Sequence, residues 1–156
     1  MTRKLTLPIY TLLTGLILNH AVYAQSESAT ASIHNAFSSW TASFNRKDLN
    51  ATCDLFAQNL ILEYQGQPAK NYDEVCQNFK KLFASPDINY HYEYKIHNIY
   101  QTNDWAAVRI TWILKADNKN KNEILIQEEG MDIMAKTPSG KWKIIRSFAY
   151  PSHALA

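Results

Sequence analysis

The stretch "DINYHYEYKIHNIY", residues 87 to 100, holds the densest group of side chains that could bind a metal or move protons. His91, Glu93 and His97 are all of metal-ligand type. In a strand that rises about 3.3 Å per residue, the two histidines would lie roughly 20 Å apart, too far to share one ion. His91 and Glu93 would be neighbours on one face, about 7 Å apart. Two ligands do not make a site, so we expect no metal and no cofactor.

Glu128, Asp132 and Arg146 are the polar residues that could act on a ligand. If Arg146 and Phe148 face the interior from the last strand, the arginine needs an anionic partner. Glu128 or Asp132 on the preceding strand would be within cross-strand reach. Such a pair would recognise an anion or a carbonyl group. The alternative is a structural ion pair or an exposed strand edge.

Aromatic side chains could supply the wall of a pocket. At helical or strand spacing the same residues could instead form the hydrophobic core. The candidates are Trp40, Phe44, Tyr64, Trp112 and Phe148. The histidines lie in no recognisable Ser-His-Asp or Cys-His arrangement, so the sequence gives no case for nucleophilic catalysis.

Residues 1 to 24 have the pattern of a secretory signal peptide. Arg3 and Lys4 precede an apolar run from Leu5 to Leu18, which is too short to span a bilayer, and small residues suit cleavage before Gln25. An uncleaved anchor is the alternative. Cleavage would leave 14 basic against 14 acidic residues. We therefore expect a periplasmic or secreted protein without affinity for nucleic acid and without membrane insertion.

Cys53 and Cys76 both lie in the exported part. An even number of cysteines in an oxidising compartment favours a disulfide over two buried thiols. A C-x-x-C redox motif is absent from the sequence. We expect a structural bond that joins two helices.

The elements that would position these residues begin with helices. Apolar residues at spacings of four, three and four predict an amphipathic helix over 32–47. Asp48 fits the N-cap of a short second helix. Asn71 and Glu74 have capping-box spacing for a third helix, which ends before Pro86. The stretch "NLILEYQG" between the last two helices predicts a strand.

After Pro86 the pattern changes to period two, which predicts strands over 88–100, 105–115, 123–135 and 141–150. Alternation in the first of these separates two faces. One face carries Ile88, Tyr90, Tyr92, Tyr94 and Ile96, and the other carries His91, Glu93, Lys95 and His97. Gly130 predicts a bulge that shifts the facing of later side chains. The order of elements predicts an α+β fold with an antiparallel meander.

This order, with "FNRKDLNATCDLFAQNLILEY" near the start and "GKWKIIRSFAYPS" at the end, resembles the nuclear transport factor 2-like superfamily, in its SnoaL-like and ketosteroid-isomerase-like branch. The resemblance covers about residues 32 to 151. It implies a cone, in which a strongly bent, mostly antiparallel sheet wraps around the N-terminal helix, with three helices and an apolar pocket at the open end. Members include isomerases, dehydratases, cyclases and non-catalytic modules, so the fold alone does not choose the function.

A ketosteroid-isomerase-like mechanism needs a carboxylate base near the end of the first strand and a tyrosine on the first helix. The base position falls on Tyr64, and alternation points the adjacent Glu63 to the opposite face. The tyrosine position falls near Phe37 and Trp40, which lack an acidic hydroxyl. The resemblance therefore gives little support to that reaction.

The sequence thus predicts a signal peptide at 1–24, a flexible lead-in at 25–31, one nuclear transport factor 2-like domain at 32–151 and a tail at 152–156. We expect a homodimer packed through the sheet. The predicted function is binding of a small apolar or carbonyl-containing molecule in the cone. The alternatives are an isomerase, lyase or cyclase that uses a pocket carboxylate, and a non-catalytic dimerisation or interaction module. An enzyme would place Glu63, Glu128, Asp132 or Arg146 at an open cavity.

Overall fold

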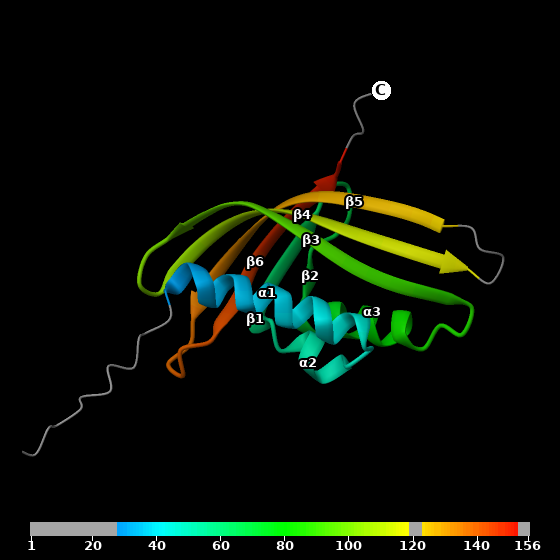
Figure 1. The fold of residues 1–156 in the computed structure, drawn as a ribbon, viewed down its shortest axis with the longest axis horizontal. Coiled ribbons are helices and arrows are strands. Elements are labelled where there is room, and N and C mark those ends of the chain that lie inside the picture. Colours follow the sequence, from blue (N-terminus) through cyan, green and yellow to red (C-terminus); the bar gives the residue numbers. More distant parts are fainter. Residues whose placement is uncertain (1–27, 119–122, 153–156) are drawn as a thin grey trace, which may run out of the picture.

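The computed structural model describes residues 28–118 and 123–152, which form one curved sheet with helices against it (Figure 1). The predicted signal peptide lies outside this range. Among the described residues the sheet has six strands in the order β2-β1-β6-β5-β4-β3. The elements are α1 (Ala29–Asn45), α2 (Leu49–Cys53), β1 (Phe56–Tyr64), β2 (Lys70–Asn71), α3 (Tyr72–Phe83), β3 (Ile88–Gln101), β4 (Trp105–Asn118), β5 (Glu123–Lys136) and β6 (Trp142–Pro151).

The helices begin where the sequence places cap residues. The Asp48 carboxylate accepts a hydrogen bond from the Ala51 amide at 3.1 Å and starts α2. At α3 the capping box is complete, because Asn71 accepts from the Glu74 amide at 3.0 Å and Glu74 accepts from the Asn71 amide at 2.8 Å. Both predicted caps are confirmed. Helix α1 begins at Ala29, earlier than predicted.

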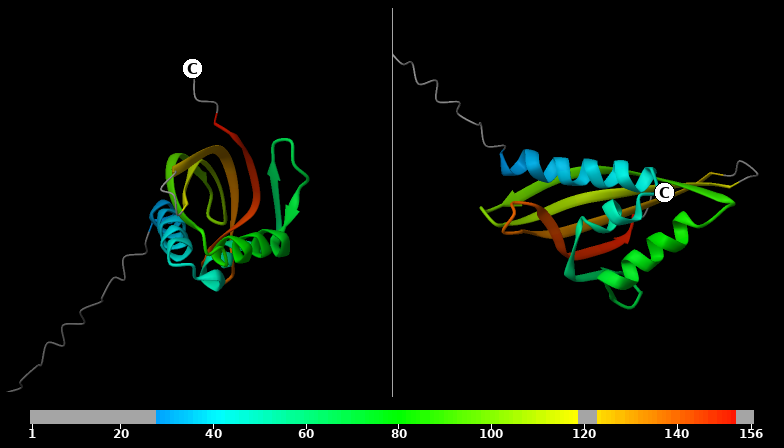
Figure 2. Two further views of the ribbon diagram at one scale, coloured as in Figure 1. Left: turned by 90° about the vertical axis from the view of Figure 1, so that its right-hand side faces the viewer. Right: turned by 90° about the horizontal axis from the view of Figure 1, so that it is seen from below.

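The sheet pairs antiparallel except at β1 and β6, which run parallel. Figure 2 shows it curling around α1, so the predicted α+β cone is confirmed. The register on β5 runs unbroken through Gly130, and the predicted bulge there is wrong. The extra residues are His97 in β3 and Ile145 in β6, where pairing with the neighbouring strand shifts. These bulges bend the strands and decide which later side chains face inward.

The core lies between α1 and the concave face of the sheet. Helix α1 buries Ile33, Phe37, Trp40 and Phe44 at the predicted spacing. The tyrosine side of β3 packs against this core. Alternation had separated this side from the charged side without saying which of the two faces inward. His97 bonds to Thr111 on the opposite face of the sheet at 2.6 Å, which also agrees with the predicted alternation.

Asn45, the last residue of α1, binds the backbone of the edge strand β3. Its amide nitrogen donates to the Tyr92 carbonyl at 3.0 Å, and its amide oxygen accepts from the Tyr92 N–H at 2.8 Å. Both backbone groups lie on the side of β3 that faces away from β4. The paired bonds fix the end of α1 against the sheet.

Asn45→Ala is expected to lower the free energy of unfolding by about 2 kcal/mol, because it leaves the N–H and C=O of Tyr92 without these partners. Urea unfolding followed by far-UV circular dichroism measures the loss. Asn50→Ala removes an exposed amide from α2 and should change stability by less than about 0.5 kcal/mol. Equal stability of the two variants would show that the Tyr92 contact contributes nothing.

Cys53 at the end of α2 is bonded to Cys76 in α3, with 5.8 Å between their Cα atoms. The sequence separation of 23 residues means that the bond closes a loop containing all of β1. The predicted link between the second and third helices is confirmed. Among the described residues we find no helix with the length and apolar character required to cross a bilayer.

Candidate functional site

A small cavity of about 90 Å³ lies inside the cone, between α1 and the concave face of the sheet. An apolar cavity of about 150 Å³ holds one benzene molecule, so this space admits roughly three or four non-hydrogen atoms. It is lined by Trp40, Phe56, Leu62, Tyr64, Phe79, Tyr92, Trp112, Glu128, Asp132, Ile144, Ser147 and Ala149. Most of this lining is apolar or aromatic, which is typical of small-molecule sites.

The aromatic part of the lining is packed edge to face. The ring centroids of Trp40 and Trp112 lie 4.8 Å apart, and those of Trp40 and Tyr92 lie 5.3 Å apart. Such contacts add to the burial of the rings and hold them in defined positions. Trp40 therefore contacts two sheet residues of the lining at once.

Asp132 is the deepest carboxyl group of the lining and is 1 % exposed. Burial raises the pKa of Asp132 to about 6, while hydrogen bonds from Ser147 and Trp112 to the carboxyl oppose the rise. Its Oδ2 atom is buried and has no hydrogen-bond partner among the described residues. A carboxyl group in this setting can donate a hydrogen bond when neutral or accept one when charged.

Glu128 lies four residues earlier on β5 and is only partly buried. Burial raises the pKa of Glu128, while a hydrogen bond from the Tyr64 hydroxyl and the charge of Lys70 oppose the rise. Burial also raises the pKa of Tyr64, and the negative charge of Glu128 adds to that effect. Glu128 and Tyr64 thus form one hydrogen-bonded unit in the wall of the cavity.

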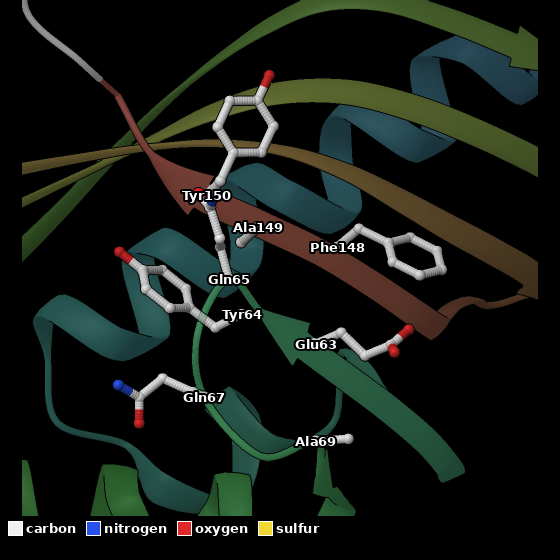
Figure 3. Close-up of a pocket in the computed structure, with 8 residues that line it drawn as sticks. All are labelled: Glu63, Tyr64, Gln65, Gln67, Ala69, Phe148, Ala149 and Tyr150. Carbon is white, nitrogen blue, oxygen red and sulfur yellow. The ribbon is translucent and has the colours of Figure 1, made fainter.

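A wider hollow of about 630 Å³ lies beside the cavity and is open to solvent (Figure 3). The two spaces share Tyr64 and Ala149, which pair across β1 and β6. Figure 3 shows Glu63 and Phe148 pointing to the other side of these strands from Tyr64. The expected outward direction of Glu63 is confirmed.

The structure brings five of the eight predicted pocket residues to the same cavity. They are Trp40, Tyr64, Trp112, Glu128 and Asp132. Phe44 is fully buried but lies outside the lining, where it packs against Trp40 at 5.5 Å and Phe83 at 5.0 Å. Phe44 is therefore a core residue rather than part of the wall.

The inward placement predicted for Arg146 and Phe148 is wrong. The extra residue Ile145 reverses the alternation of β6, so Ser147 faces Asp132 and the cavity. Arg146 donates to the backbone carbonyls of Asn59 at 3.1 Å and Ile145 at 2.7 Å, and it makes no pair with either carboxylate predicted for it. Phe148 is 43 % exposed and lines the outer hollow.

Several lining residues were missed by sequence reasoning. Ser147 was missed because nothing in "KIIRSF" marks Ile145 as a bulge. Alternation grouped Tyr92 with the other tyrosines of β3, but it did not say that this face lines the cavity. Phe56 and Phe79 reach the cavity from β1 and α3, and only the closing of the cone brings these two elements together.

A second polar cluster lies on the outer face of the sheet. The Thr111 hydroxyl donates to Glu129 at 2.7 Å and contacts His97 Nε2 at 2.6 Å. His97 Nε2 lies 3.9 Å from the Glu129 carboxylate. Within 28–118 and 123–152, no three His, Cys, Asp or Glu side chains are placed to hold a metal ion.

The sequence profile of the SnoaL-like domain matches residues 37–144, which is more than half of the chain. This match includes α1 from Phe37 and most of the sheet. Among curated proteins, none matches the chain.

Solved structures share the fold. A ketosteroid isomerase-like protein from Erwinia carotovora is 23 % identical with a TM-score of 0.64, and the match covers 79 % of this chain and 95 % of that one. ActVI-ORFA from Streptomyces coelicolor is 10 % identical with a TM-score of 0.67, covering 80 % and 98 %. A protein from Catenulispora acidiphila in complex with S-DNPA is 6 % identical with a TM-score of 0.66, covering 78 % and 92 %.

Proposed function

Because the chain belongs to the SnoaL-like domain family, we propose that it is an exported protein that binds a small, mostly apolar molecule in the cavity of the cone. The observation that carries this proposal is the buried Asp132 carboxyl group in a cavity otherwise lined mainly by aromatic and aliphatic side chains. An apolar wall with one well-placed polar group supplies both affinity and orientation. The ligand-bound structure from Catenulispora supports binding within this fold.

The volume of the cavity limits what enters it. Only a compact group, such as a carbonyl carbon with its substituents, fits without movement of the lining. A larger molecule would place such a group in the cavity and extend past Tyr64 into the outer hollow.

Ala149→Leu is expected to abolish binding, because the longer side chain fills the space that the ligand needs. Ala107→Leu is the matched control, since Ala107 is a half-buried alanine on β4 that lines neither the cavity nor the outer hollow. Protein purified from its native periplasm and examined by native mass spectrometry should carry a small molecule in the wild type and in Ala107→Leu. Circular dichroism verifies folding, because overpacking costs about 1–3 kcal/mol. A wild type that carries nothing and binds no small-molecule probe would refute the proposal.

A second candidate is an isomerase or lyase that uses the two carboxyl groups of β5. It is favoured by one observation, that Glu128 and Asp132 share a cavity in which burial raises the pKa of both. Glu128 would take a proton from the substrate, and Asp132, which is neutral below its pKa of about 6, would then donate a hydrogen bond to a developing oxyanion. Carboxyl groups whose pKa is raised by burial beside a cavity are typical candidates for acid–base sites.

The enzymatic role is tested with a panel of small ketones in D₂O. NMR measures how fast the protein exchanges deuterium for the hydrogens on the carbon next to the carbonyl group. Glu128→Gln should lower any such rate by about 10²-fold or more, because it removes the base. Glu129→Gln is the control, since Glu129 lies on the opposite face of β5. An unchanged rate in Glu128→Gln would exclude this role for Glu128.

Export and self-association are further parts of the proposal. The bond between Cys53 and Cys76 supports an oxidising compartment. Exposed Phe148 and Tyr150 support a homodimer packed through the outer face of the sheet. Export predicts a mature protein whose mass corresponds to a chain that starts at Gln25, and a full-length mass would contradict it. Self-association predicts a dimer by light scattering that dissociates in Phe148→Lys, and a wild-type monomer would contradict it.

A further inference from the structure

Two buried polar atoms on the lining residues lack hydrogen-bond partners among the residues that the structure describes. They are Nε1 of Trp40, a donor, and Oδ2 of Asp132. Trp40 is 4 % exposed and Asp132 is 1 % exposed. The comparable indole of Trp142, also buried, donates to the Ser32 hydroxyl at 3.1 Å. The two unsatisfied atoms therefore stand out within one small region.

Buried polar groups nearly always have a partner, because an unsatisfied one loses its bonds to water without replacement. Trp40 and Asp132 come from α1 and β5, and Trp112 lies between them. Its ring is 4.8 Å from that of Trp40, and it hydrogen-bonds to the Asp132 carboxyl. One compact group in the cavity could thus satisfy both atoms at once.

Both atoms are closed off from solvent. A partner for them would have to come from a group bound in the cavity that both residues line. The donor and the acceptor must belong to one small group, because the cavity admits only about three or four non-hydrogen atoms.

The chemistry of the two atoms restricts the ligand. An ammonium group carries donors only, so it would leave the Trp40 N–H without an acceptor. A carboxylate carries acceptors only and would meet Asp132 as a like charge. A simple ketone satisfies Trp40 but offers no donor to a charged Asp132.

We infer that the cavity selects an uncharged head group with one acceptor for Trp40 Nε1 and one donor for Asp132 Oδ2, as in a primary amide or a hydroxycarbonyl compound. The inference rests on the proposed binding function and names the class of its ligand. Acetamide is the smallest probe with this pattern. Acetone and isopropylammonium have the same number of non-hydrogen atoms and lack the donor and the acceptor, respectively.

The indole resonances of ¹⁵N-labelled protein report directly on Trp40. Acetamide should shift the Trp40 Nε1–H signal, with a Kd between about 0.1 and 10 mM for so small a ligand. The Trp142 signal should stay in place, because that indole already has a partner. Acetone and isopropylammonium should bind at least about tenfold more weakly, as expected for a lost hydrogen bond that leaves a buried group unsatisfied.

Two variants separate the roles of the atoms. Trp40→Phe removes the donor but keeps an aromatic ring, and should lower the affinity for acetamide about tenfold. Asp132→Asn should make acetone bind more tightly than acetamide. An NH₂ group in the place of the unpartnered Oδ2 is a donor, so the cavity would then need an acceptor for both Trp40 and residue 132. The unchanged Trp142 resonance verifies that each variant is folded.

Three outcomes would overturn the inference while leaving the proposed function intact: equal affinity for acetamide and acetone, tighter binding of isopropylammonium, or binding of acetamide without movement of the Trp40 signal. If no probe binds although the native protein carries a small molecule, the inference fails and the proposed function stands. If the native protein also carries nothing, the proposed function itself fails.

Discussion

Asp132→Asn is expected to raise the free energy of unfolding at neutral pH by roughly 2 to 3 kcal/mol. In the folded protein the pKa of Asp132 is about 6, above its ordinary value of 3.8, because the side chain is buried. At a pH between 3.8 and about 6, the Asp132 carboxyl is therefore protonated in the folded chain and ionised in the unfolded chain. Stability accordingly falls as the pH rises from about 4 to about 6, and it stays reduced above that window. Asparagine has no such loss because it does not ionise.

Urea unfolding of the wild type and the variant, at about pH 4 and about pH 7.5, measures the effect. The two proteins should be nearly equally stable at the lower pH and should separate at the higher one. Asp54→Asn is the control, because Asp54 is half exposed and its pKa is lowered by a hydrogen bond and the charge of Lys143. That variant should lose up to about 1 kcal/mol above the titration range. If the difference in free energy of unfolding between the wild type and Asp132→Asn does not change with pH, the raised pKa of Asp132 is refuted.

The double variant Cys53→Ala, Cys76→Ala is expected to lose about 3 kcal/mol of stability, because the unfolded chain is no longer restricted by the closed loop. The loop spans 23 residues and contains β1, whose end carries Tyr64. The same bond holds α3, which supplies Phe79 to the cavity. We therefore expect the variant to bind probes of the cavity more weakly as well as to unfold earlier.

Urea unfolding of the oxidised wild type, the reduced wild type and the double variant tests this prediction. The last two should unfold at nearly the same urea concentration, because neither has the covalent link. Alkylation without reductant should leave the mass of the oxidised protein unchanged. If the reduced wild type and the double variant each lose less than about 1 kcal/mol of stability, the bond adds little to stability.

The sequence was sufficient for the elements because their signals are local. The cap of α2 at Asp48 and the capping box of Asn71 and Glu74 depend on residues three positions apart, and both form as predicted. The shared face of the tyrosines in β3 follows from period two, although its inward direction does not. These features need no knowledge of distant contacts.

The site was less predictable because it depends on register. One extra residue in a strand sends every later side chain to the opposite face, and Ile145 is such a residue. The sequence offered Gly130 as the signal for a bulge, yet Gly130 sits in unbroken pairing. A Cβ at Gly130 would lie 3.0 Å from the Phe148 carbonyl oxygen. Close approach of two strands, rather than a bulge, is thus the reason for a glycine there.

Asp132 could be named from the sequence, but its environment could not. Its raised pKa comes from burial, and its partners Ser147 and Trp112 lie on β6 and β4, which are far apart in the sequence. The spacing of Phe44 correctly predicted that it is buried, but it did not show whether Phe44 lies in the core or lines the cavity.

The contact of Asn45 with Tyr92 has a consequence for aggregation. β3 is the last strand of the sheet, and an uncovered edge strand is a template on which other chains can add as cross-β structure. Asn45 already occupies the N–H and C=O that an incoming strand would need at this position. One amide side chain at the end of a helix thus acts as a gatekeeper, and protects an aromatic, β-prone segment of the chain from amyloid-like pairing.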